Sequence, residues 1–113
     1  MPPGETLGYK VRELLLPDGA NPFRDWLETL DHQTRAVVQT RVLRFEMGNL
    51  GRTRSVGHGV IENKIDHGPG YRIYFGLDGK ELVLLLLGGT KKTQKKDIST
   101  AHGYWKGYKT SKP

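Results

Sequence analysis

The sequence contains no cysteine among its 113 residues, which excludes a disulfide framework and any metal site built on thiolates. It also has no long hydrophobic run. The longest, 82–87, is far shorter than the roughly 20 residues of a membrane-spanning helix. The opening MPPGETLG has neither a basic nor an apolar stretch, so we expect no signal peptide. These absences predict a soluble, cytoplasmic protein whose length fits one domain.

Acidic side chains are scarce at the C-terminal end. The formal net charge is +6, and residues 1–89 carry eleven basic and eleven acidic side chains. Residues 90–113 carry seven lysines against one acid, Asp97. The net charge therefore lies entirely in this last segment. Such a basic segment permits acidic proteins, nucleic acid or an anionic surface as partners, and it is equally compatible with a solvated helix face.

Local patterns predict a strand and two helices in the first half. Residues 9–16 alternate loosely and end at a Pro-Asp-Gly turn, as a strand does. Asn21 is a suitable N-cap before Pro22, and apolar residues follow at helical spacing as far as Leu30. Asp31 can cap a second helix that ends near Gly48. The two helices would form an αα-hairpin.

The second half predicts three strands and a closing helix. The strand-like segments are 60–66, 71–75 and 81–87. We expect the double glycine at 88–89 to end the last strand, and residues 93–108 to form the helix. The predicted order is strand, helix, helix, three strands, helix, which is an α+β domain with a mostly antiparallel sheet. We assign residues 9–109 to this domain, 1–8 to a poorly ordered segment and 110–113 to a tail.

The sequence has no Gly-rich phosphate loop, no HExxH and no nucleophile elbow. Its four histidines, which show no metal-ligand spacing, are His32, His58, His67 and His102. We therefore expect no metal and no cofactor. His67, in the connection between two predicted strands, is the histidine best placed to act as a general acid or base. The alternative for it is a solvated loop histidine.

Basic and aromatic residues gather in the predicted sheet. Lys64 and Arg72 would lie within reach of one another across a hairpin, with Tyr74 on the same face. The next strand would deliver Lys91 and Lys92 near the start of the closing helix, where anions are favoured. Such a cluster would be stabilised by a polyanion. The alternative is that each cation pairs with a neighbouring carboxylate in an ordinary surface salt bridge.

Four stretches of the sequence resemble the RelE/ParE superfamily of toxins, and specifically its HigB-like, phage-related addiction module killer proteins: PDGANPFRDWLETLD, FEMGNLG, ENKIDHGPGYRIYFG and LVLLLLGGTKKTQKKDISTAHGYWKGY. The resemblance covers roughly residues 9–108. It implies the compact RelE-like fold and a cognate antitoxin with a helix-turn-helix DNA-binding domain, joined with the toxin in a hetero-oligomer. In RelE-like members it also implies metal-independent cleavage of mRNA in the ribosomal A site.

The resemblance assigns roles to three basic residues. Arg72 would stabilise the phosphate, Lys64 would help to activate the ribose 2′-OH, and Lys91 would assist the leaving 5′-oxygen. Preorganised cations of this kind stabilise the charge that develops as the 2′-OH attacks the phosphate. The other lysines expected to bind RNA or the ribosome are Lys92, Lys95, Lys96, Lys106 and Lys109. Lys112 would be ribosome-facing or solvated.

Two positions depart from the RelE pattern. Glu62 stands where RelE carries a second lysine, and it would act as a general base or hold Lys64 in place. The tyrosine of the last RelE helix falls near Asp97, so Tyr74 or Tyr104 would have to replace it.

Two other functions stay open at the level of sequence. One is a ParE-like inhibitor of DNA gyrase without catalysis. The other is a phage-derived binding module without toxicity. The joint presence of Lys64, Arg72 and Lys91 favours the ribonuclease.

Overall fold

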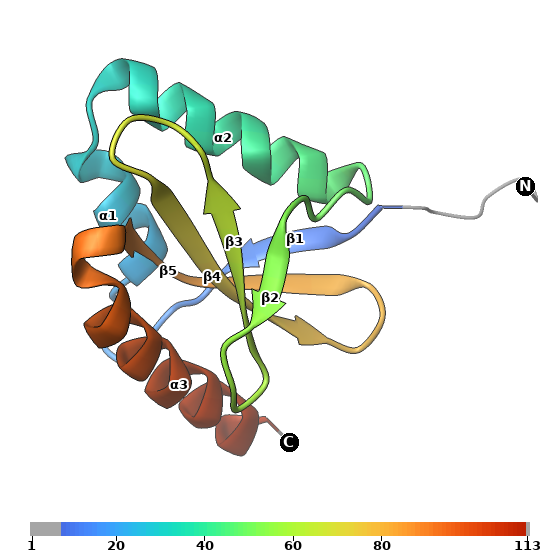
Figure 1. Ribbon diagram of the computed structural model, residues 1–113. Helices are drawn as coiled ribbons and strands as arrows, with labels where there is room; N and C mark the ends of the chain where they lie inside the picture. The colour runs from blue at the N-terminus through green and yellow to red at the C-terminus, as the bar shows by residue number, and fades with distance from the viewer. Residues whose placement is uncertain (1–7, 113) are drawn as a thin grey trace, which may run out of the picture.

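The first elements are a short strand and a helical hairpin, in a computed structural model that describes residues 8–112 (Figure 1). They are β1 (Lys10–Glu13), α1 (Pro22–Thr29) and α2 (His32–Glu46). The predicted caps are confirmed, because the Asn21 side chain accepts from Arg24 N and the Asp31 side chain accepts from Thr34 N. β1 is shorter than the predicted strand because Leu16 N already bonds to Ala20 O in a turn.

The second half supplies four strands and the last helix. The strands are β2 (Thr53–Ser55), β3 (Val60–Ile65), β4 (Tyr71–Asp78) and β5 (Leu82–Thr90), and a 3₁₀ turn, η1 (Lys91–Thr93), leads into α3 (Gln94–Ser111). The sheet order is β1-β5-β4-β3-β2, with β1 parallel to β5 and the other neighbours antiparallel. The predicted α+β class is confirmed, and β2 adds a strand that the sequence pattern did not predict.

The last helix runs slightly past the predicted end of the domain. α3 continues to Ser111, two residues past the limit set at 109. The poorly ordered segment predicted for residues 1–8 lies outside the described residues except for Gly8. The last residue, 113, also lies outside them.

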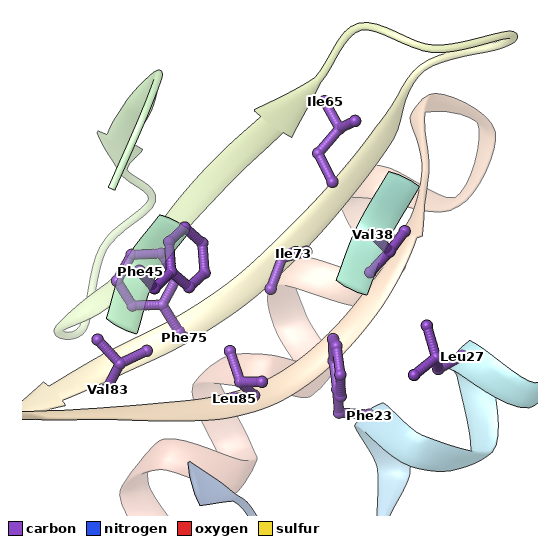
Figure 2. Packing of buried hydrophobic residues seen from close by; sticks show 9 residues of the cluster. All are labelled: Phe23, Leu27, Val38, Phe45, Ile65, Ile73, Phe75, Val83 and Leu85. Atoms are coloured by element: carbon purple, nitrogen blue, oxygen red, sulfur yellow. The ribbon is translucent and has the colours of Figure 1, made fainter. Parts of the chain in front are cut away.

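The helical hairpin covers one face of the sheet, and its buried side chains form the larger hydrophobic core. Figure 2 shows Phe23 and Leu27 from α1 and Val38 and Phe45 from α2 beside the apolar residues of β3, β4 and β5. The sheet contributes Ile65, Ile73, Phe75, Val83 and Leu85.

α3 packs on the opposite face, which gives the domain three layers (Figure 1). Trp105 is only 5% exposed and lies in the second cluster with Tyr74 and Leu86. The expectation that Trp105 is a core residue is therefore confirmed. Near the outer strands this face is less covered, since the side chains of Arg54 and Lys64 are 60% and 41% exposed.

The double glycine does not end β5, and the expectation that it does is wrong. The strand continues through Gly88 and Gly89 to Thr90. A Cβ at Gly88 would overlap the ring of Trp26, and one at Gly89 would overlap the carboxylate of Asp97. These glycines therefore let α1 and α3 approach the two faces of the strand closely, which is a different use of glycine from a strand stop.

Candidate anion-binding site

A basic pocket forms where the β3–β4 hairpin meets the turn that precedes α3. Lys64 and Arg72 are cross-strand neighbours in the antiparallel register. Lys91, the first residue of η1, lines the same cavity of about 420 Å³. The structure thus brings together the three cations that the sequence pattern predicted to be neighbours. Their individual roles stay predictions.

Arg72 is the most deeply placed cation of this pocket. The residue is 6% exposed, and its Nε lies 3.8 Å from Glu62 Oε2, which is an ion pair longer than a hydrogen bond. Its Nε and Nη1 are buried without a hydrogen-bond partner within residues 8–112. Unpaired donors on a buried guanidinium are costly, which makes this side chain the candidate anion-binding group of the pocket.

Glu62 holds the basic residues of the site in place. Its Oε1 accepts from Arg54 Nε at 2.9 Å, and its Oε2 accepts from Gln94 Nε2 at 2.8 Å. Burial acts to raise the pKa of the Glu62 carboxyl, but the hydrogen bonds from Arg54 and Gln94 and the charge of Arg54 outweigh it, so the pKa lies below its usual value. A carboxylate that is ionised and committed in this way is a poor general base.

Glu62 and Lys64 form no ion pair within residues 8–112, which corrects the expectation that Glu62 holds Lys64 in place. Lys64 Nζ instead lies 3.7 Å from Asp66 Oδ1. The physical reason is the register: Glu62 faces Arg54 across β2 and β3, so the nearest cation to its carboxylate comes from the neighbouring strand.

Neither of the two tyrosines considered as catalytic lines the basic pocket. Tyr74 is 0% exposed in the cluster under α3, and burial, followed by the negative charge of Glu62, raises the pKa of its hydroxyl. A fully buried hydroxyl with a raised pKa has no access to a substrate in solvent, so we exclude Tyr74 from the candidate catalytic residues. Tyr104 lines a different cavity, next to Leu14 and Leu16.

His67 lines the basic pocket together with Lys64, Arg72 and Lys91. Its Nε2 lies 3.5 Å from Thr34 Oγ1, which is a weak contact at the limit of a hydrogen bond. The sequence signal for this residue was its place in the connection between two strands that carry the cations. The structure supports that placement.

A second cavity of about 280 Å³ adjoins the first and shares Lys64 and Arg72 with it. Arg52 and Arg54 line it from the edge strand β2 and the residue before it. Both contact carboxylates, Arg52 that of Asp66 and Arg54 that of Glu62. Sequence reasoning missed these two arginines because it did not predict β2.

The other lysines of the basic segment differ in their surroundings. Those predicted to bind RNA or the ribosome are all exposed: Lys92, Lys95, Lys96, Lys106 and Lys109. Lys106 and Lys109 line a third cavity, near the C-terminal end of α3. Lys112 instead bonds to Asp78, with its Nζ 2.6 Å from Oδ2. The basic segment therefore does not act as one uniform surface.

Residues 8–112 contain neither a membrane-spanning helix nor a metal-binding cluster of side chains. No helix in that range combines the length and the apolar character that crossing a membrane requires. No group of three or more His, Cys, Asp or Glu side chains in it is arranged to hold a metal ion.

Comparison with known proteins identifies the family. The family model described as phage derived protein Gp49-like (DUF891) matches residues 25–105. A protein of Haemophilus influenzae strain Rd, named only as an uncharacterized protein, is 42% identical over 80 residues, which is 70% of this chain and 81% of the relative. No solved structure matches. The chain belongs to the Gp49-like family of phage-derived proteins, a family associated with addiction-module toxins.

Proposed function

We propose that this protein is the toxin of a type II toxin–antitoxin module, of the HigB-like branch of the RelE/ParE superfamily, and that it cleaves mRNA on the ribosome. The observation that carries the proposal is the guanidinium of Arg72, which is buried with two nitrogens unpartnered in the described chain and is flanked by Lys64 and Lys91. A planar guanidinium can donate two parallel hydrogen bonds to the oxygens of a phosphate diester, as it does to a carboxylate.

The cations would act on the charge of the reaction. A ribose 2′-OH attacks the adjacent phosphorus, and the P–O5′ bond breaks to leave a 2′,3′-cyclic phosphate and a 5′-hydroxyl. Negative charge grows on the phosphate oxygens before the bond breaks, and donors that are already in position stabilise it without reorganisation. Arg72 and Lys64 would contact these oxygens, and Lys91 would face the departing 5′-oxygen.

Two protons must move in this step. One leaves the 2′-OH and one reaches the 5′-oxygen on the opposite side of phosphorus, so a base and a separate acid are needed. Glu62 is committed to Arg54 and Gln94, and Tyr74 is buried. We therefore assign removal of the 2′-OH proton to His67, the histidine of this pocket, in place of those two residues, and delivery of a proton to the 5′-oxygen to the ammonium group of Lys91.

A toxin of this kind requires a partner that neutralises it. We propose a cognate antitoxin that carries a helix-turn-helix DNA-binding domain and forms a hetero-oligomer with this chain. The basic pocket calls for an acidic segment in that partner, because opposite charges speed and orient association.

Induction of the protein in growing cells, followed by mapping of transcript ends, tests the proposal. We expect growth arrest, cuts within translated frames and 2′,3′-cyclic phosphate ends that need ribosomes in a purified reaction. Lys64→Ala should abolish the cuts, and its side chain is exposed enough for the fold to survive. Arg44→Ala, an exposed arginine of α2, is the matched control and should cut normally.

Intact transcripts during growth arrest would overturn the ribonuclease. If supercoiling by purified gyrase were blocked at the same time, the ParE-like inhibitor would take its place. Harmless high-level expression without a partner would overturn the toxin itself.

A further inference from the structure

The loop between β2 and β3 has an unusual backbone at its tip. Gly57, His58 and Gly59 all have positive φ, of 93°, 55° and 83°. The two glycines adopt this region freely, whereas a side chain there is costly, although histidine is among the residues found in it more often. A third glycine would be easier to accommodate at His58. A side chain kept in a costly conformation points to a use for it.

The tip of this loop packs closely against α3. A Cβ at Gly59 would overlap the indole of Trp105, and one at Gly57 would lie against the ring of His102. The rings of His58 and His102 meet edge to face, with their centroids 4.5 Å apart. His102 Nε2 lies 2.8 Å from the carbonyl oxygen of Val56. A carbonyl only accepts, so Nε2 carries the hydrogen of this contact.

These two histidines line a cavity of about 550 Å³ with Lys106 and Lys109. The other lining residues, Gly103, Trp105 and Thr110, carry no charge, and no carboxylate lines the cavity. The charged side chains that line the cavity are therefore both basic. Two ammonium groups beside the imidazoles oppose a metal cation and favour an anion.

The cavity lies along the same surface as the candidate site. The β2–β3 hairpin runs from the arginines of the second cavity to His58, with its tip beside α3 (Figure 1). Along α3, His102 follows Gln94, which lines that second cavity, by eight residues. At 1.5 Å per residue this is about 12 Å. A stacked strand that rises about 3.4 Å per nucleotide would cover it with roughly four nucleotides.

We propose that the cavity around His58 and His102 is a second phosphate-binding pocket, which holds the RNA backbone a few nucleotides from the bond that is cut. The identity of the ligand as RNA rests on the proposed function. The ammonium groups of Lys106 and Lys109 attract the phosphate, and the imidazole of His58 contributes a ring nitrogen to the same cavity.

His58→Gly is the variant that tests the pocket, because glycine suits the positive φ and the fold should keep its stability. The probe is a fluorescent 12-nucleotide RNA with 2′-O-methyl groups, which binds but has no 2′-OH to attack phosphorus. Anisotropy at pH 6 should show that His58→Gly weakens binding of this probe about 3- to 10-fold, because one side-chain contact to the backbone is lost. A 2′-O-methyl trinucleotide, followed by NMR titration, should bind both proteins equally because it is too short to join the two sites.

His32→Ala is the matched control, since it removes an exposed imidazole from the start of α2. This variant should bind the 12-nucleotide probe and the trinucleotide as tightly as wild type does. Equal binding of the 12-nucleotide probe by wild type and His58→Gly at pH 6 would overturn the pocket, and so would an equal loss with the trinucleotide or with His32→Ala. The proposed function fails separately: if His58→Gly weakens binding while transcripts stay intact on ribosomes, the pocket stands and the ribonuclease falls.

Discussion

Arg72 and Glu62 form a buried ion pair that is not closed by a hydrogen bond. Arg72 Nε lies 3.8 Å from Glu62 Oε2, and both side chains are less than 10% exposed. The carboxylate oxygens are occupied by Arg54 and Gln94 instead. Glu62 therefore offsets the charge of Arg72 without accepting a hydrogen bond from its Nε.

Arg72→Lys should keep the charge of the pocket and lose its function. The substitution removes the planar fork that matches two phosphate oxygens, so we expect cleavage to fall about 100- to 1000-fold. RNA affinity should fall far less, because a cation is still present. Single-turnover cleavage on purified ribosomes and a binding titration separate the two quantities. Cleavage within about 3-fold of wild type would remove Arg72 from the catalytic group.

Glu62→Gln should destabilise the fold at neutral pH by about 2 kcal/mol, because it weakens charge-assisted hydrogen bonds inside the protein. The pKa of Glu62 is lowered in the folded state from its ordinary 4.5. Its contribution is therefore complete above about pH 4.5 and is lost as the pH falls through the lower, folded pKa. Urea unfolding from pH 7 to pH 3 should show a smaller acid loss in the variant than in wild type. If the free energy of unfolding fell equally with pH in the variant and in wild type, the role given to this carboxylate would be contradicted.

Gly88→Ala and Gly103→Ala should change stability in opposite directions. A Cβ at Gly88 overlaps the Trp26 ring, so we expect a loss of about 1–3 kcal/mol from overpacking. Gly103 lies in α3 with open space around it, and alanine should stabilise the helix by about 0.5–1 kcal/mol. Thermal and urea unfolding of the two variants measure this. A stabilised Gly88→Ala protein would show that the strand and α1 can separate without cost.

Lys91→Ala and Lys112→Ala should differ in the salt dependence of RNA binding. A lysine that neutralises one phosphate of a single strand contributes about 0.7 to the slope of log K against log salt. Lys91 lines the pocket, whereas Lys112 bonds to Asp78. We expect Lys91→Ala to flatten the slope by that amount and Lys112→Ala to leave it unchanged. Equal slopes for both variants would show that the segment binds RNA as a diffuse charge.

His67→Gln should slow cleavage about 100-fold or more while RNA affinity stays within about 2-fold of wild type, since it removes proton transfer but no fixed charge. The measurement is the pH profile of single-turnover cleavage. A wild-type profile with a rise or fall near neutral pH should become flat in the variant. An unchanged profile would assign the proton to another group.

Much of the fold follows from short stretches of sequence. Asn21 with Pro22, and Asp31, begin their helices through contacts with residues three positions away, so sequence inspection predicts them correctly. The alternation in 60–66 also predicts which side chains share a face. By contrast, β2 is three exposed residues with no apolar pattern, and it becomes a strand only because β3 offers an edge to pair with.

The candidate site divides in the same way. Strand periodicity and chain order are local properties, and they suffice to place Lys64 and Arg72 on one face of neighbouring strands and Lys91 after the central strand. They do not reveal which carboxylate meets which cation, that the Arg72 guanidinium is buried without hydrogen bonds from its Nε and Nη1, or that His58 meets His102. Those outcomes depend on the pairing of β2 with β3 and on the packing of α3 across the sheet. Both are contacts between segments far apart in the chain, where side-chain shape and burial decide the partner and periodicity carries no information.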